Sequence, residues 1–156
     1  MKIIKFIHIT LFILLLNACA SIPDEPCPVL LVEDDKPTRE MMAHTLEKSG
    51  WAVCEAGNGR EALDQLVQQK PRLILLDLMM PVMDGFDFLL EMRVNADWRD
   101  IPVIVLTAKE LTGEDRRVLS GRVEQIIEKG ACSPETLLEP IRRLITGGAD
   151  THAHDA

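Results

Sequence analysis

Hydrophobic residues form short runs from residue 29 onward, and these runs alternate with stretches of helical periodicity. Three runs contain four consecutive aliphatic residues each, at 29–32, 73–76 and 103–106. Uninterrupted apolar runs of this length are typical of strands buried on both faces of a parallel sheet. Residues 51–56 and 123–127 are less uniformly apolar, which favours positions at the sheet edges. The pattern therefore predicts five strands.

Helical segments are expected between these strands because apolar residues recur there at separations of three and four. The residues assigned to the buried helix faces are Met42 and Leu46; Ala62, Leu63, Leu66 and Val67; Phe86, Leu89 and Leu90; and Leu137, Ile141, Leu144 and Ile145. The pattern is weakest for a further helix between Thr112 and Ser120. We expect Asp35 to cap the first helix and Asp84-Gly85 to form a turn.

Alternating strands and helices predict a parallel sheet covered by helices on both faces. Right-handed crossovers then lead to an α/β fold, the flavodoxin-like (βα)5 doubly wound sheet with strand order 2-1-3-4-5. We place this domain at residues 28–146, after a linker at 19–27 and before a polar, disordered tail at 147–156.

The first residues differ sharply from the rest of the chain. Lys2 and Lys5 precede an apolar run from Phe6 to Leu16 that is too short to span a membrane, so residues 1–18 are typical of a secretory leader. Residues 16–19, Leu-Asn-Ala-Cys, resemble the lipobox of bacterial lipoproteins, which would make Cys19 a candidate for lipidation. A fortuitous apolar leader or a wrongly chosen start codon is the alternative interpretation.

Composition excludes several classes of protein. The chain carries 25 acidic and 17 basic residues, a formal net charge of -8, so direct binding to nucleic acid is not expected. Four cysteines lack a CxxC pair and nearby histidines at ligand spacing, which leaves a zinc site without support. Apart from Cys19, we expect these cysteines to be reduced thiols rather than disulfide partners.

Charged and hydroxyl side chains follow the predicted strands. Glu33 and Asp34 follow the first predicted strand, Asp77 the third and Thr107 the fourth, and Lys129 follows the last strand. All of these positions lie at the carboxyl edge of the sheet, where doubly wound folds bind ligands. Three carboxylates repel one another unless a cation lies among them, and oxygen ligands suit Mg²⁺. With a hydroxyl and an ammonium added, the set predicts phosphoryl transfer to a carboxylate.

The motifs VEDD, LILLDLMMPVMDGFDFL, VIVLTA and EKG resemble the receiver domains of two-component response regulators, over roughly residues 28–146. Residues 111–130 are most similar to the C-terminal receivers of hybrid sensor kinases. Thr107 and Lys129 lie 30 and 52 positions after Asp77, which are separations familiar in receivers.

The resemblance implies that Asp77 is the phosphorylated residue, and that Glu33, Asp34 and Asp77 bind Mg²⁺ together with the backbone carbonyl of Met79. Thr107 and Lys129 would contact the phosphoryl group, while Met79 and Lys109 would tune its lifetime because they flank the path of the attacking water. These implied sites are, in full, Glu33, Asp34, Asp77, Met79, Thr107, Lys109 and Lys129.

The resemblance also implies a phosphorelay role without a separate catalytic domain. The phosphoryl donor would be a histidine kinase, a phosphotransfer protein or a small phosphodonor, and the signal would pass through protein contacts without an output domain. Gly130 replaces the usual proline, so we expect a trans peptide bond after Lys129. Ile126 replaces the aromatic residue of many receivers, which argues against signalling by an aromatic swivel.

Two other classes of protein are alternatives to a phospho-accepting receiver. A haloacid-dehalogenase-like phosphatase also uses a strand-end aspartate, but Met79 stands where that site needs a second acid. A lipid-anchored pseudo-receiver, attached to the membrane through acylated Cys19, is favoured only by the leader. The phosphoryl chemistry favours the cytoplasm, whereas a working leader would make the protein a membrane-anchored lipoprotein.

Overall fold

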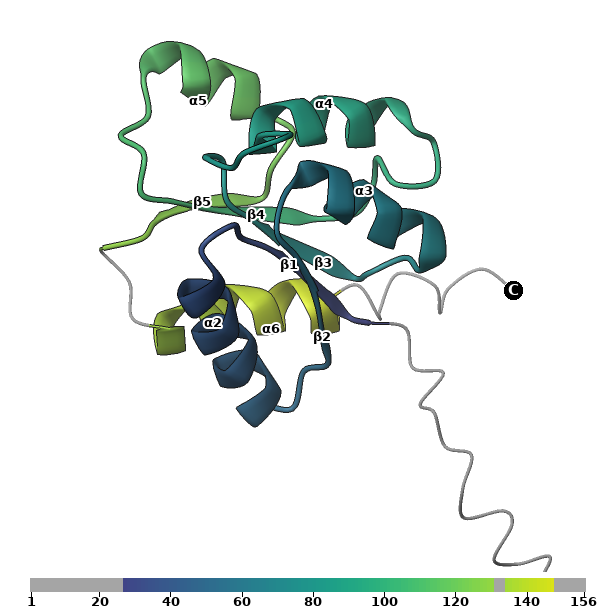
Figure 1. Ribbon diagram of the computed structural model, residues 1–156, viewed down its shortest axis with the longest axis vertical. Coiled ribbons are helices and arrows are strands. Elements are labelled where there is room, and N and C mark those ends of the chain that lie inside the picture. Colours follow the sequence, from purple (N-terminus) through teal and green to yellow (C-terminus); the bar gives the residue numbers. More distant parts are fainter. Residues whose placement is uncertain (1–26, 131–133, 148–156) are drawn as a thin grey trace, which may run out of the picture.

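The computed structural model of the protein describes residues 27–130 and 134–147, which form a five-stranded parallel sheet with helices on both faces (Figure 1). The strand order is β2-β1-β3-β4-β5, so the predicted doubly wound, flavodoxin-like fold is confirmed. The leader with Cys19 and the tail beyond residue 147 lie outside the described residues. In chain order the elements are β1 (Val29–Val32), α2 (Lys36–Lys48), β2 (Val53–Ala56), α3 (Gly59–Gln68), β3 (Leu73–Leu76), α4 (Gly85–Val94), β4 (Val103–Thr107), α5 (Gly113–Leu119), β5 (Gln125–Glu128), a 3-10 turn η1 (Pro134–Leu137) and α6 (Leu138–Gly147).

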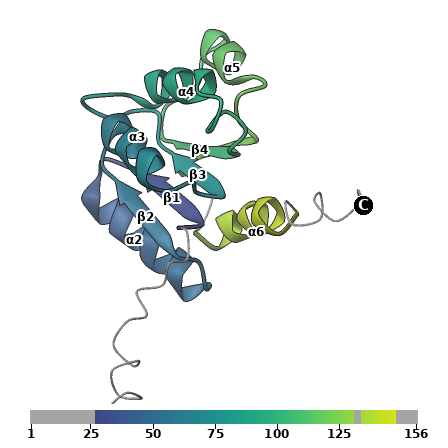
Figure 2. The same cartoon turned by 90° about the vertical axis from the view of Figure 1, so that its right-hand side faces the viewer.

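Two helical layers cover the sheet. Helices α3, α4 and α5 lie on one face, and α2 and α6 lie on the other (Figures 1 and 2). Alternate residues of each central strand enter the two separate hydrophobic cores; in β1, Leu30 belongs to the first core and Leu31 to the second. The predicted central runs are fully buried because both of their faces meet a helical layer.

Side-chain caps define where the helices begin. Asp35 accepts a hydrogen bond from the backbone N–H of Thr38 at 2.9 Å, which confirms its expected role as the cap of α2. Asp84 caps α4 in the same way, so the predicted Asp84-Gly85 turn is also the start of a helix. Gly50 follows α2 with a φ of +89°, a conformation that a residue with a Cβ rarely adopts.

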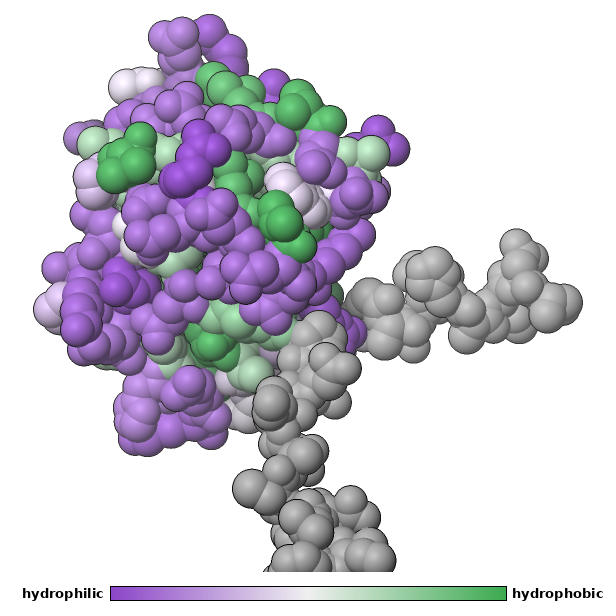
Figure 3. All heavy atoms as spheres, turned by 45° about the vertical axis from the view of Figure 1, so that its right-hand side comes forward, coloured by the Kyte–Doolittle hydropathy of each residue, from purple (hydrophilic) through white to green (hydrophobic). Residues whose placement is uncertain are grey.

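Two predicted core positions are wrong. Val67 is 74% exposed and Leu90 is 47% exposed. On α4 the buried stripe instead contains Phe88, Leu89 and Met92, and a rotation of about 100° per residue turns Leu90 away from it. The surface shown in Figure 3 is mostly hydrophilic, with hydrophobic residues in small separate patches, as expected for scattered exposed apolar side chains.

The expectation of reduced thiols is wrong for one pair, because Cys27 and Cys54 form a disulfide. Cys27 precedes β1 and Cys54 lies near the start of β2, and these strands pair in parallel with Val29 opposite Val53. The two Cα atoms lie 5.9 Å apart, within the range that a disulfide spans. Cys19 and Cys132 lie outside the described residues.

None of the helices within residues 27–130 and 134–147 has the length and apolar character needed to cross a membrane. All peptide bonds of these residues are trans, including the bond after Lys129, as expected from the glycine at position 130.

Candidate phosphoryl-acceptor site

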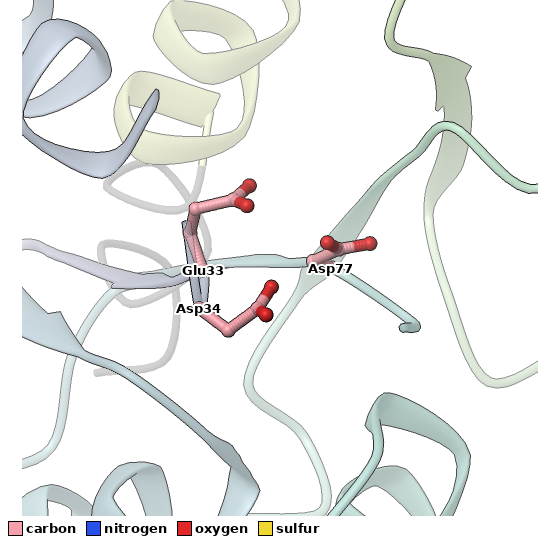
Figure 4. Close-up of side chains that lie close together, drawn as sticks. All are labelled: Glu33, Asp34 and Asp77. Carbon is pink, nitrogen blue, oxygen red and sulfur yellow. The ribbon is translucent and has the colours of Figure 1, made fainter. Parts of the chain in front are cut away.

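Three carboxylates meet at the carboxyl ends of β1 and β3. These strands are neighbours in the sheet, with Val32 opposite Leu76, so the residues that follow them are brought together. Figure 4 shows the side chains of Glu33, Asp34 and Asp77 lying close to one another. One oxygen from each carboxylate lies within 4.8 Å of the others. The convergence predicted from the strand ends is therefore present in the fold.

Burial differs among the polar residues of the site. Glu33 and Asp77 are only 2% and 6% exposed, and Thr107 is completely buried, whereas Asp34 is exposed. Across the described part of the chain, these three are the only buried polar or charged side chains. A buried carboxylate is costly unless it is paired or hydrogen-bonded, so the site requires a compensating cation.

Lys129 supplies that cation in the structure. Its Nζ lies 2.5 Å from Oε2 of Glu33 and 2.8 Å from Oδ2 of Asp77. Burial raises the pKa of Glu33, although the hydrogen bond from Lys129 opposes this change. For Lys129, burial disfavours the charged form, but the hydrogen bonds to Asp77 and Glu33 outweigh it and raise the pKa of the ammonium. The lysine therefore stays protonated between the two carboxylates at neutral pH.

The pairing of β4 with β5 positions both Thr107 and Lys129. Thr107 is the last residue of β4, and its carbonyl accepts a hydrogen bond from the backbone N–H of Lys129 at 2.8 Å. The Thr107 hydroxyl oxygen accepts another from the backbone N–H of Lys109 at 3.0 Å. A hydroxyl and an ammonium are thus fixed at one edge of the sheet by adjacent strand ends.

The loop after β3 holds Asp77 from its other side. The backbone N–H of Met79 donates to Oδ1 of Asp77 at 3.2 Å, while the Met79 side chain is 58% exposed. A Cβ at Gly85 would lie 2.4 Å from the carbonyl oxygen of Asp77, so only glycine allows the start of α4 to come this close. Sequence reasoning treated Gly85 as part of a turn and missed this contact.

Arg39 is a further residue of the site that sequence reasoning missed. Its Nη1 donates to the carbonyl oxygen of Glu33 at 2.5 Å, and its Nε lies 3.1 Å from Oε2 of Glu55 on β2. An arginine in the first turns of α2 thus braces the loop that carries the acidic pair. No motif in the sequence marks this residue, because the contact depends on how α2 packs beside β1.

Lys109 lies next to the site but points elsewhere. Its Nζ lies 3.0 Å from Oδ1 of Asp115 on α5 and 5.1 Å from the centre of the Phe86 ring on α4. A cavity of about 520 Å³ opens beside Thr107 and Lys129, and Lys109 and Arg116 also line it. The structure therefore places a second lysine, bound to a carboxylate, at the rim of the cavity beside Thr107 and Lys129.

Comparison with known proteins identifies the family. The response regulator receiver domain matches residues 29–142. The chain is 34% identical over 120 residues to the response regulator MprA of Mycolicibacterium vanbaalenii, covering 77% of this chain and 51% of that protein. The chain thus spans about half the length of this curated relative.

Solved structures agree with this assignment. The receiver domain of a signal transduction histidine kinase from Syntrophus aciditrophicus has a TM-score of 0.71 at 32% identity, covering 82% of this chain and 96% of that one. The receiver domain of sensor histidine kinase PA1611 from Pseudomonas aeruginosa, which has a magnesium ion coordinated in its active-site cleft, has a TM-score of 0.68 at 28% identity, covering 76% and 96%.

The chain belongs to the response regulator receiver family of two-component signal transduction. Members of this family are generally signalling modules rather than enzymes, and they interact with histidine kinases or phosphotransfer proteins. The alternative of a haloacid-dehalogenase-like phosphatase loses its support, because the family match covers the whole sheet with Asp77, Thr107 and Lys129.

Proposed function

We propose that the protein is a phospho-accepting receiver in a phosphorelay and that Asp77 carries the phosphoryl group. One observation supports this most directly. The Asp77 carboxylate is buried, yet its two oxygens are held by different donors, the Met79 N–H at 3.2 Å and the Lys129 ammonium at 2.8 Å. A carboxylate held in this way is oriented for attack on a phosphorus atom.

The proposed chemical step transfers the phosphoryl group from the donor to Asp77. A carboxylate oxygen of Asp77 forms a bond to phosphorus, and the bond from phosphorus to the donor's imidazole nitrogen, or to the acyl oxygen of a small phosphodonor, breaks. The bonding electrons leave with the donor group. We expect Lys129 and the Thr107 hydroxyl to bind the phosphoryl oxygens, over which negative charge is spread during transfer.

The acidic cluster fits a divalent cation. Glu33, Asp34 and Asp77 contribute only oxygen ligands, and the exposed position of Asp34 leaves one side open to water and to a phosphoryl oxygen. We propose that these three residues, with the Met79 carbonyl, hold Mg²⁺. When bound, Mg²⁺ would neutralise the charge shared between the carboxylates and the phosphoryl group.

A labelling experiment tests the acceptor. Incubation with acetyl phosphate and Mg²⁺ should add one phosphoryl group of about 80 Da, detected by intact-protein mass spectrometry. Asp77→Asn should abolish the added mass, whereas Asp87→Asn, which changes an exposed aspartate in the first turn of α4, should not. Label that persists in Asp77→Asn would disprove the assignment, and a wild-type protein without label would indicate a pseudo-receiver.

Metal binding has its own test. We expect weak Mg²⁺ binding that tightens with a phosphate mimic, because three carboxylates leave several positions of the ion to water. Calorimetric titration of Asp34→Ala should show loss of this response. An unchanged response would remove Asp34 from the metal site.

The proposal also includes the phosphoryl donor and the cellular location of the protein. The phosphoryl donor is a histidine kinase or a phosphotransfer protein, with which receiver domains in general interact. Acylation of Cys19 and membrane attachment stay predictions from the leader. Cell fractionation of the full-length protein and of its Cys19→Ala variant tests both predictions. If Cys19 is acylated, the wild type should be found in the membrane fraction and the variant should not.

A further inference from the structure

The contact between Lys109 and Asp115 lies beside the acceptor site without being part of it. Lys109 Nζ and Asp115 Oδ1 are 3.0 Å apart, and the two side chains are 30% and 16% exposed. The backbone N–H of Lys109 also binds the Thr107 hydroxyl oxygen at 3.0 Å. Lys109 thus joins the end of β4 to the start of α5.

Asp115 is itself firmly positioned. Its Oδ2 accepts hydrogen bonds from the Thr112 backbone N–H and from the Thr112 hydroxyl, both at 2.9 Å, as part of the capping box of α5. The hydrogen bond from the Thr112 backbone, followed by that from Lys109, lowers the pKa of Asp115. One oxygen therefore caps the helix while the other faces Lys109, and the carboxylate stays charged at neutral pH.

Lys109 lines the same cavity as Thr107 and Lys129. A phosphoryl group on Asp77 would bring negative charge to the edge of this cavity, because Lys129 contacts Asp77 directly. The Lys109 ammonium would then face two anions, the phosphoryl group and Asp115. Removal of Asp115 would leave the phosphoryl group as the stronger attraction.

We propose that Asp115 is a positioning residue that holds the Lys109 ammonium at the start of α5 and so limits how well Lys109 covers the phosphoryl group. This inference rests on the proposed function of Asp77. In the affected step, water attacks phosphorus, the bond from phosphorus to the Asp77 oxygen breaks, and inorganic phosphate leaves while the carboxylate is restored. A lysine that covers the phosphoryl oxygens slows this attack, so Asp115 shortens the lifetime of the phosphorylated state.

The test measures the decay of labelled protein in excess Mg²⁺ after acetyl phosphate has been removed. Asp115→Asn keeps an oxygen that can cap α5 but loses the charge that binds Lys109. Because an ion pair that is partly open to solvent is weak, decay should slow by about 2- to 5-fold. In the Lys109→Gln background the same substitution should have no further effect, since Asp115 would then have no cation to hold.

Controls separate this role from a structural one. Glu114→Gln removes an equal charge from an exposed residue in the same helical turn and should leave the decay rate unchanged. Asp115→Glu retains the charge and should restore decay to near the wild-type rate even if the cap is weakened. Urea unfolding of each variant reports any loss of stability separately.

Three results would overturn the inference: equal decay of Asp115→Asn and wild type, an equal effect of Asp115→Asn in both Lys109 backgrounds, or an equal slowing by Glu114→Gln. Failure of the proposed function is distinguishable, because it appears as wild-type protein that takes up no label on Asp77. Variants that are all labelled but decay equally would reject only the role of Asp115.

Discussion

The two ends of the same sheet are built in opposite ways. At the carboxyl ends of β1 and β3, Glu33, Asp77 and Lys129 form a buried charged cluster. At the amino ends of β1 and β2, a disulfide joins Cys27 to Cys54. Buried charges are weak evidence of stabilisation, whereas a covalent link restricts the unfolded chain. We therefore expect the carboxyl end to serve the proposed phosphoryl chemistry and the amino end to serve stability, so that a change at one end leaves the other end intact.

The largest effect on stability is expected at the amino end. Cys54→Ser removes the disulfide, whose two cysteines lie 27 positions apart in the sequence. Loss of this cross-link should lower the free energy of unfolding by about 3 kcal/mol. Urea unfolding of the oxidised protein measures this loss. Labelling of Asp77 by acetyl phosphate, measured under conditions where the variant is folded, should keep its wild-type extent.

The pairing of the two cysteines provides the control. Cys27→Ser, Cys54→Ser and the double variant should lose the same stability, because each removes the same bond. A reductant should bring the wild type to the level of these variants. Losses that add in the double variant, or a wild type that does not respond to reductant, would contradict a disulfide. A large fall in labelling would contradict the separation of the two ends.

How far the sequence predicts this molecule depends on whether a feature is local. Central strands such as 73–76 are recognised because burial on both faces requires uninterrupted apolar residues. The acidic cluster is predicted because all parallel strands end at one edge, so the residues after β1 and β3 must meet. Asp35 is recognised as a cap because its hydrogen bond to Thr38 spans only three residues.

Features that depend on register or on packing between elements were not predicted. The Cys27–Cys54 bond requires β2 to lie beside β1 in the sheet, and cysteine spacing carries no such information. The pair of Lys109 and Asp115 depends on the path of the loop between β4 and α5. Leu90 was misassigned because apolar character alone does not reveal which side of α4 faces the sheet.

A smaller effect on stability is expected at the carboxyl end from Lys129→Met. This change leaves Glu33 and Asp77 buried without their cation. Loss of one partner from a buried pair costs several kcal/mol, but Lys129 is 22% exposed, so we expect a loss of about 2 kcal/mol at pH 7 without Mg²⁺. Lys36→Met, which removes an exposed lysine, should change stability far less.

The stability of Lys129→Met should depend on pH in a defined direction. Burial already raises the pKa of Glu33 in the folded protein, and without Lys129 it should rise further. The folded variant then binds more protons than the unfolded chain between the ordinary Glu value of 4.5 and neutrality, so its stability should increase as the pH falls from 7 towards 5. Urea unfolding at both values measures this. A deficit equal at pH 5 and pH 7 would show that Lys129 contributes packing rather than charge.

The smallest effect is expected within the proposed acceptor site, where a substitution at Met79 changes a rate without changing the buried cluster. The Met79 side chain is 58% exposed and has no polar group that could orient water towards a phosphoryl group on Asp77. Met79→Asn introduces an amide at this position, while the backbone N–H of residue 79 can still donate to Asp77. Decay of the phosphorylated protein should accelerate by about 3- to 10-fold, equivalent to about 0.7 to 1.4 kcal/mol of barrier.

Decay of labelled wild type and Met79→Asn in excess Mg²⁺ measures this difference directly. Met41→Asn, a change of an exposed methionine on α2, serves as the matched control and should decay at the wild-type rate. If the amide acts by positioning water, only the substitution at residue 79 should accelerate decay. The free energy of unfolding should stay nearly unchanged, because an exposed side chain contributes little to the core. A Met79→Asn protein that decays at the wild-type rate or more slowly would show that the apolar side chain does not protect the phosphoryl group, and that the lifetime is set by Lys109 and its neighbours instead.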